Sequence, residues 1–339
     1  MSTSESSITN SGIISDNMVL ERDQDIPSSH IPVVDLSSPD QELVARAVVK
    51  ASEEWGVFQV VNHGIPTKVI QRLQNVGRQF FELSEAEKNV VAKPDDSREG
   101  YARRYELDLE RKTGTVDQLF HNIWPPSSVN YKYWPKNPLD YREANEEYTK
   151  HVKMLSEKIM EWLSEGLGLW GEAIKEVISG EYMMIVNYYP PCPHSDLIEG
   201  LDPHTDVSGL TLILPNEIPG LQVFKDDNWF DLEIIPSAVI VIIGDQIQRL
   251  SNGRYKSVLH MGHMPHLALT WVRPLHKTTV DKERTRMSWP VLVRPTNDMV
   301  VGPFPEIIDH DNPPKFKHIA YKDYIYRKVR HLSFADLDS

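Results

Sequence analysis

Apolar residues recur along the chain with two different periods, and the change falls near residue 180. In the first half an apolar position comes every three or four residues, which is the helical spacing. This spacing predicts helices over residues 38–56, 66–83 and 143–169. The last is the strongest, because an apolar stripe follows one face and Gly166 and Gly168 end it. The stripe consists of Val152, Leu155, Ile159 and Leu163.

The first predicted helix has apolar residues at Leu43, Ala47 and Ala51. Ser38 or Asp40 can cap its start, because both side chains carry an oxygen that accepts a free backbone N–H. We therefore expect a helix that starts at this cap and stops at Gly56.

After residue 180 the pattern changes to short β-rich runs separated by Gly, Pro and Asn. Short strands after a helical half favour a mixed α+β fold: a double-stranded β-helix, or jelly-roll, core with an N-terminal helical region packed around it. Residues 249–260 are interpreted as a hairpin that turns at Asn252 and Gly253. The polar stretch 98–116 is predicted to be a surface loop or lid.

Composition limits the class of function. The net charge is −13 over 339 residues and no Lys/Arg block is present, so we expect no nucleic-acid partner. The apolar runs are too short to span a bilayer, and the first residues lack the apolar core of a secretory signal. A single cysteine, Cys192, favours a reducing compartment. We expect a cytoplasmic monomer that acts on a small molecule.

His204 and Asp206 are the first candidates for metal binding. They are two residues apart, and in an extended segment such residues point the same way. An imidazole and a carboxylate can therefore converge on one ion. With a second histidine they would form the two-His-one-carboxylate set that leaves positions open on Fe(II).

Two further pairs have the same spacing. Arg286 and Ser288 would place a guanidinium beside a hydroxyl, which suits the distal carboxylate of a 2-oxo diacid. Asn187 and Tyr189 would point toward the same cosubstrate. Together with the His-x-Asp pair, they indicate an Fe(II)/2-oxoglutarate oxygenase.

Several motifs resemble plant 2-oxoglutarate-dependent dioxygenases, and most of all flavonol synthases. They are "IPVVDL", "EEWGVFQVVNHGIP", "NYYPPCP", "HTDVSGLTLILPNEIPGLQVFKDDNWFDL", "SNGRYKSVLH" and "RMSWPV", and the resemblance covers roughly residues 31–330. It implies a jelly-roll fold, Fe(II), 2-oxoglutarate, O2 and turnover supported by ascorbate. It also implies a flavonoid or related phenolic substrate, with a dihydroflavonol oxidised to a flavonol and 2-oxoglutarate converted to succinate and CO2.

The resemblance assigns His204 and Asp206 to iron, and Arg286, Ser288, Tyr189 and Asn187 to 2-oxoglutarate. We expect the chain to divide into five segments. They are a disordered tail at 1–28, an N-terminal dioxygenase region at 29–135, supporting helices at 136–178, the jelly-roll core at 179–300 and a C-terminal segment at 301–339.

A 16-residue insertion interrupts the family pattern at residues 261–276. "SVLH" ends at His260, and "KTTVDKERTRMSWPV" resumes only after His276. Each histidine keeps one family spacing, since Asp206 to His260 is 54 positions and His276 to Arg286 is 10 positions.

His260 is the preferred third ligand. Pro274 cannot donate to a strand ladder two residues before His276, which disfavours the alternative. Two alternatives to His260 stay open: His276 is the third ligand, or the chain has no competent third ligand. His263 and His266 are interpreted as solvent-facing bystanders.

The resemblance also implies five substrate-binding positions. They are Phe120, Gln118, Ile185, Leu292 and Arg294. Phe120 is the residue usual in flavonol synthases, whereas the usual residues at the other four positions would be His, Lys, Phe and Glu. Three interpretations follow: an active flavonol-type oxygenase, an inactive or nearly inactive relative, and an oxygenase of another small phenolic.

Overall fold

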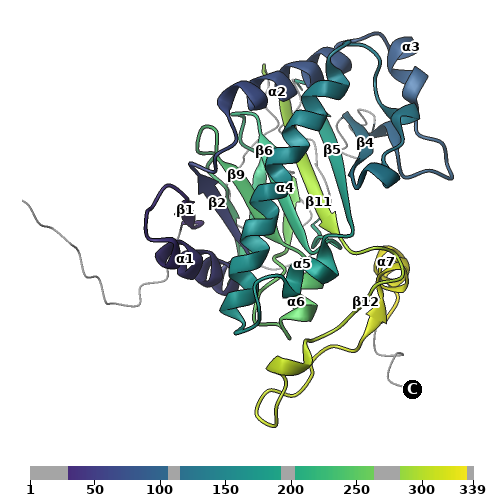
Figure 1. Ribbon diagram of the computed structural model, residues 1–339. Helices are drawn as coiled ribbons and strands as arrows, with labels where there is room; N and C mark the ends of the chain where they lie inside the picture. The colour runs from purple at the N-terminus through teal and green to yellow at the C-terminus, as the bar shows by residue number, and fades with distance from the viewer. Residues whose placement is uncertain (1–29, 106–114, 192–202, 263–282, 334–339) are drawn as a thin grey trace, which may run out of the picture. The chain divides into compact units, whose positions relative to one another are not determined.

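The structure is a computed structural model, and it describes residues 30–105, 115–191, 203–262 and 283–333. The predicted tail at residues 1–28 lies outside the described residues. The described strands and helices are arranged as Figure 1 shows.

An eight-stranded sheet forms the centre, with the strand order β1-β2-β9-β6-β11-β5-β4-β3. Its first pair, β1–β2, is parallel, and the central pairs are antiparallel. The strands are β1 Val33–Asp35, β2 Val57–Val61, β3 Gly100–Tyr105, β4 Val116–Trp124, β5 Glu181–Tyr189, β6 Leu210–Pro215, β9 Val239–Ile243 and β11 Arg286–Arg294.

The central strands present alternate residues to two faces of this sheet. On β11, Met287, Trp289 and Val291 belong to the main hydrophobic core, which also contains the apolar stripe of the long helix. The residues between them, such as Pro290, point to the opposite face of the sheet. Ile213 of β6, which pairs with Pro290, points to that face too. This second surface, on which the even-numbered residues of β11 lie, is named the interior face.

A smaller sheet with the order β10-β7-β8 is joined to the interior face by a second apolar core. This core combines Ile213 and Ile240 of the large sheet with Leu221 and Val223 of the small one. The small sheet consists of β7 Leu221–Lys225, β8 Asn228–Asp231 and β10 His260–Gly262. Two sheets joined through a common core, with helices outside, agree with the predicted jelly-roll arrangement.

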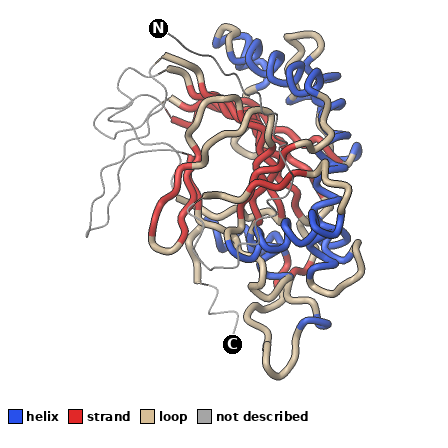
Figure 2. Tube along the Cα trace, turned by 90° about the vertical axis from the view of Figure 1, so that its left-hand side faces the viewer, coloured by secondary structure: helices blue, strands red, loops and turns tan. Residues whose placement is uncertain are grey.

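The helices gather on one side of the strands, as Figure 2 shows. The longest, α4, contacts both α1 and α2 and places its stripe in the main core. The helices are α1 Gln41–Glu54, α2 Thr67–Phe81, α3 Glu85–Lys88, α4 Tyr141–Gly166, α5 Ala173–Ile178, α6 Asp245–Leu250 and α7 Tyr321–Val329. Short strands β12 Val300–Val301 and β13 Ile319–Ala320 pair with each other before α7.

The prediction for α4 is confirmed, and its four stripe residues are all buried. The cap of α1 is also confirmed, since the Asp40 side chain accepts the Leu43 N–H at 2.9 Å. Of the apolar residues noted at helical spacing on α1, Ala51 is buried and Leu43 is not. Val44 and Val48 are buried, whereas Leu43 is 53% exposed, because contact with α4 selects the valine face.

The prediction of an irregular stretch at residues 98–116 is wrong for its first part. Residues 100–105 form β3, which pairs with β4 through Gly100 opposite Phe120 and Ala102 opposite Gln118. The polar composition hid this strand, because β3 is an edge strand and needs few apolar residues. Residues 106–114 lie outside the described residues.

Candidate active site

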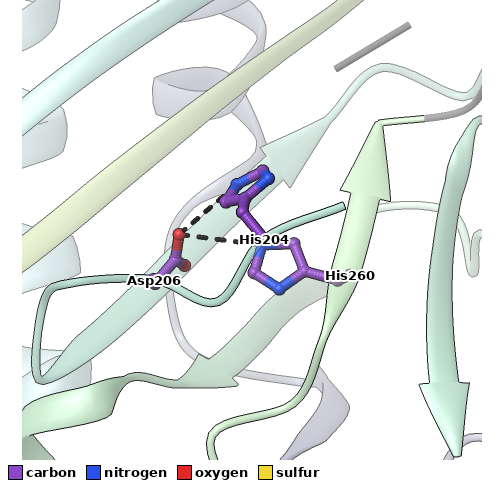
Figure 3. A group of neighbouring side chains, drawn as sticks. All are labelled: His204, Asp206 and His260. Carbon is purple, nitrogen blue, oxygen red and sulfur yellow. Dashed lines mark ion pairs between the residues drawn. The ribbon is translucent and has the colours of Figure 1, made fainter. Parts of the chain in front are cut away.

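Three side chains that can bind a metal converge where the start of β10 meets the segment that precedes β6. His204 Nε2 lies 3.8 Å from Asp206 Oδ1, and His260 Nε2 lies 3.6 Å from the same oxygen. Figure 3 shows the two imidazoles and the carboxylate turned toward one another. One ligand atom from each residue lies within 4.8 Å of the others. Two imidazole nitrogens and one carboxylate oxygen form a donor set that suits Fe(II).

His204 and His260 are brought together by backbone pairing. Each N–H donates to the carbonyl of the other at 2.9 Å, which forms an isolated antiparallel bridge. His260 also pairs with Val223 at the start of β10. Its Nδ1 lies 3.0 Å from the Val258 carbonyl, so donation there leaves Nε2 as the lone-pair nitrogen. His260 is only 4% exposed.

Asp206 has one orphaned oxygen. Its Oδ2 is buried and has no hydrogen-bond partner among the described residues. A buried carboxylate oxygen without a partner is costly, and a bound cation would satisfy it. The side chains of the triad therefore fit a metal ion both in donor type and in geometry.

The predicted hairpin over residues 249–260 is wrong. Residues 245–250 form helix α6, and Asn252 and Gly253 close it with left-handed φ values of 52° and 82°. The Gly253 N–H donates to the Gln248 carbonyl at 2.8 Å, which is a helix-terminating contact. Asn-Gly tolerates the left-handed region equally well in a hairpin and at a helix end, so the dipeptide did not separate the two.

The insertion leaves the neighbouring strand in register. On β11, Arg286 lies opposite Tyr189 and Ser288 lies opposite Asn187. The alternative ligand His276 lies outside the described residues, as do His263 and His266. Of the two histidines at the ends of the insertion, only His260 is among the described residues, and it lies beside Asp206.

The four residues expected at the cosubstrate site form a contiguous group on β5 and β11. Arg286 Cζ lies 4.7 Å from the centre of the Tyr189 ring. The Asn187 amide donates to Ser288 Oγ at 3.1 Å. In turn, the Gln118 amide of β4 donates to Asn187 Oδ1 at 2.6 Å. This chain of hydrogen bonds orients the Ser288 hydroxyl beside the guanidinium.

Gly220 allows the Arg286 side chain to lie where it does. A Cβ added to Gly220 would stand 2.6 Å from Arg286 Nε, and the glycine φ is +147°. Arg286 Nε is buried without a hydrogen-bond partner among the described residues. A guanidinium held in this way keeps donors for an anion.

The five expected substrate positions lie along the interior face. Phe120 is directly opposite Ile185 in the β4–β5 pair, and Gln118 is opposite Asn187. Leu292 follows Ser288 on β11 on the same face. These strands place two aliphatic side chains and one aromatic ring on one surface.

Arg294 at the end of β11 does not carry an uncompensated charge. It is 8% exposed, and its Nη2 lies 2.9 Å from Glu181 Oε2 on the paired strand. It also donates to Asn122 Oδ1 at 3.3 Å. Sequence reasoning missed Glu181, and the signal was available, because Glu181 begins the strand "EYMMIVNYY" that pairs with β11.

Asp117 anchors the neighbouring strand β4 from the opposite face. Its carboxylate accepts the Arg103 Nε at 2.7 Å and the Tyr101 hydroxyl at 2.9 Å, and it lies 3.3 Å from Lys88 Nζ. Burial alone would raise the pKa of Asp117, but the bonds from Arg103 and Tyr101 outweigh it and lower the pKa. The carboxylate therefore stays charged and holds the strand that carries Gln118.

Comparisons with known proteins agree with this geometry. Residues 180–270 match the model of the 2OG-Fe(II) oxygenase superfamily, and residues 31–138 match that of the non-haem dioxygenase in morphine synthesis N-terminal region. The first match includes the three residues of the triad and ends before Arg286.

Relatives extend the match to most of the chain. A flavonol synthase/flavanone 3-hydroxylase of Matthiola incana is 67% identical over 302 residues, which is 89% of this chain and 98% of that protein. The protein of the same name in Arabidopsis thaliana is 62% identical, over 90% and 88% of the two chains. Flavonol synthase 3 of Arabidopsis thaliana is 58% identical, over 93% and 99%.

Solved structures give the same fold. The crystal structure of JOX2 in complex with 2OG, Fe and JA superimposes with a TM-score of 0.76 at 33% identity, over 88% of this chain and 85% of that one. The dioxygenase for auxin oxidation in rice has a TM-score of 0.73 at 21% identity, over 90% and 98%, which supports the fold alone.

The chain belongs to the 2OG-Fe(II) oxygenase superfamily and, within it, to the flavonol synthase family. It is an oxidoreductase that depends on Fe(II), 2-oxoglutarate and O2. The predicted jelly-roll fold with outer helices is confirmed. No helix among the described residues is both long and apolar enough to cross a membrane.

Proposed function

We propose that this chain oxidises a dihydroflavonol to a flavonol. In the balanced reaction the substrate loses two hydrogen atoms, 2-oxoglutarate is decarboxylated to succinate and CO2, and O2 supplies one oxygen atom to succinate and one to water. The observation that carries this proposal is the His204–Asp206–His260 cluster in a chain 67% identical to a protein named flavonol synthase/flavanone 3-hydroxylase.

The proposed iron ligands are His204, Asp206 and His260. Support comes from the orphaned Asp206 Oδ2 and from the Val258 carbonyl, which directs the lone pair of His260 to Nε2. When bound, iron supplies the activation of O2 that the oxidation requires. The reciprocal backbone bonds between His204 and His260 hold the two imidazole ligands next to each other.

Arg286 and Ser288 are proposed to bind the distal carboxylate of 2-oxoglutarate, beside Tyr189 and Asn187. The guanidinium stacks on the Tyr189 ring and keeps a buried Nε without a partner among the described residues. The Asn187 amide already donates to Ser288 Oγ, so the Ser288 hydroxyl proton can turn toward the carboxylate. Both groups would orient the cosubstrate by hydrogen bonds to one end.

Phe120, Ile185 and Leu292 are proposed to contact the flat rings of the substrate, with Gln118 and Arg294 at the polar edges. A planar aromatic substrate gains most from an aromatic ring and aliphatic groups on one surface. Because Glu181 compensates the charge of Arg294, the guanidinium can act as a hydrogen-bond donor to a phenolic oxygen. This arrangement favours the flavonoid reaction despite the four departures from the usual residues.

The decisive assay follows two products at once. Purified protein receives Fe(II), ascorbate, 2-oxoglutarate and a dihydroflavonol, and both succinate and flavonol are measured. We expect the two products in equal amounts. Succinate without flavonol would refute the proposal that a dihydroflavonol is the substrate. If neither product forms and the protein binds no metal, the proposal that the chain is an active oxygenase is refuted.

Matched histidine variants test the third ligand. We expect His260→Ala to lose Fe(II) affinity and His276→Ala to retain it. His310→Ala is the control, because that side chain is fully exposed. Unchanged Fe(II) affinity in His260→Ala would remove His260 from the ligand set.

We also propose a cytoplasmic monomer with small-molecule partners and no nucleic-acid partner. The net charge of −13 and the single cysteine support this proposal. A mass measured during size-exclusion chromatography tests the oligomeric state, and a mass of twice 38.9 kDa would contradict it.

A further inference from the structure

A buried carboxylate connects the segments that carry the proposed iron ligands. Asp245 begins helix α6 and is 4% exposed. Its backbone N–H donates to the carbonyl of Asp206 at 2.8 Å. Its Oδ1 accepts the Ser257 hydroxyl at 2.8 Å, three residues before His260. One residue thus bonds to both ligand-bearing stretches of chain.

The C-terminal helix α7 reaches the same carboxylate from the other side. The Tyr324 hydroxyl donates to Asp245 Oδ2 at 2.7 Å, and Lys328 Nζ lies 3.1 Å from that oxygen. Lys328 Nζ also donates to Thr205 Oγ1 at 2.6 Å. Thr205 lies between two proposed ligands in the sequence. Helix α7 therefore contacts residues 204–206, named the ligand tripeptide, directly.

We propose that Asp245, Tyr324 and Lys328 are positioning residues of the iron centre. They hold residues 204–206 against the strand that carries His260, and they make α7 part of the support of the metal site. This inference rests on the iron ligands proposed above.

The chemistry of the network suits this role. Asp245 offers two oxygens and receives a hydroxyl on one, and a hydroxyl and an ammonium on the other. Burial and the neighbouring carboxylate raise the pKa of Tyr324, so its hydroxyl stays protonated and donates. Groups that fix the ligands from outside typically change metal affinity by about 10- to 100-fold when they are removed.

The location of the ligand tripeptide explains why it needs such support. Residues 204–206 lie outside the eight-stranded sheet, and His204 joins β10 through an isolated bridge. The Asp245 N–H and the Lys328 ammonium add two bonds, one on either side of the Thr205–Asp206 peptide. Without them the relative position of the carboxylate and the two imidazoles would depend far more on that bridge.

Titration with Co(II), followed by its visible absorption, tests the inference without turnover. The series consists of wild type, His204→Ala, Lys328→Met, Tyr324→Phe and Lys322→Met. Lys322 is on the same helix and pairs with Asp298 at the surface, so it serves as the matched control. We expect Lys328→Met and Tyr324→Phe to bind Co(II) roughly tenfold more weakly or worse, with a changed spectrum, and Lys322→Met to match wild type.

A second pair keeps α7 intact. Thr205→Val removes the acceptor of Lys328 at nearly constant size, and Thr205→Ser restores it. We expect weakened Co(II) binding in Thr205→Val and wild-type binding in Thr205→Ser. If an α7 variant does not fold, these two variants still test whether the contact between Lys328 and Thr205 supports the metal site. Wild-type affinity in Lys328→Met, Tyr324→Phe and Thr205→Val would overturn the inference. Equal affinity in wild type and His204→Ala would instead overturn the iron site itself.

Discussion

Acid should destabilise this protein through one buried histidine. His121 is on β4 with its ring fully buried, 4.7 Å from the Trp134 ring in an edge-on arrangement and beside Tyr141. Burial lowers the pKa of His121 from its ordinary 6.5 to about 4. The neighbouring residues of β4, Gln118 and Phe120, belong to the interior face, so unfolding of this strand would disrupt the proposed substrate surface.

The lowered pKa of His121 decides whether the free energy of unfolding rises or falls with pH. Between pH 6.5 and 4 the unfolded chain protonates this histidine and the folded chain does not, so the free energy of unfolding falls as the pH falls. Above about pH 7.5 the contribution is constant. The linkage amounts to about 2 kcal/mol at pH 5 and levels off at about 3 kcal/mol below pH 4.

Urea unfolding of wild type and His121→Phe at pH 7.5 and pH 5 isolates this contribution. Phenylalanine fits an aromatic, apolar site and does not titrate. We expect the loss of unfolding free energy between the two pH values to be smaller in the variant by about 2 kcal/mol. His310→Phe, at a fully exposed position, should keep the wild-type loss. An equal pH dependence in wild type and His121→Phe would refute the argument.

Three further outcomes are expected. Gly220→Ala should raise the KM for 2-oxoglutarate roughly tenfold or more while Fe(II) affinity is retained, because its Cβ would stand 2.6 Å from Arg286 Nε; an unchanged KM, measured by succinate formation, would contradict the proposed role of Arg286. Asp117→Asn should cost about 3 kcal/mol of unfolding free energy, since Lys88 and Arg103 would keep only the half-exposed Glu85 as counter-charge; a loss below about 1 kcal/mol in urea would contradict this. Deletion of residues 261–276 should leave Fe(II) affinity unchanged, because the bridge of His260 to His204 and its pairing with Val223 both lie outside the deleted residues; lost binding in a folded protein would point to the inserted segment.

Local patterns in the sequence determined the periodic elements and the chemistry of the site. The stripe of α4 could be predicted because four apolar residues recur at intervals of three or four, and all four are buried. The His-x-Asp and Arg-x-Ser pairs were readable for a similar reason, since residues two apart on an extended chain share a face in any fold. On α1 two apolar faces competed, and the local pattern favoured Leu43 over Val44.

Only the tertiary structure decided which distant residues meet. His260 reaches Asp206 through reciprocal backbone bonds with His204, and Lys328 reaches Thr205 across 123 positions. Contacts of this kind produce no periodic pattern in the sequence. Which strands pair and which charged side chains meet depends on the chain segments that the two apolar cores bring together. The same holds for Asn252–Gly253, whose dihedral angles suit a hairpin and a helix end alike until α6 is in place. Local preference therefore sets the candidates, and long-range packing selects among them.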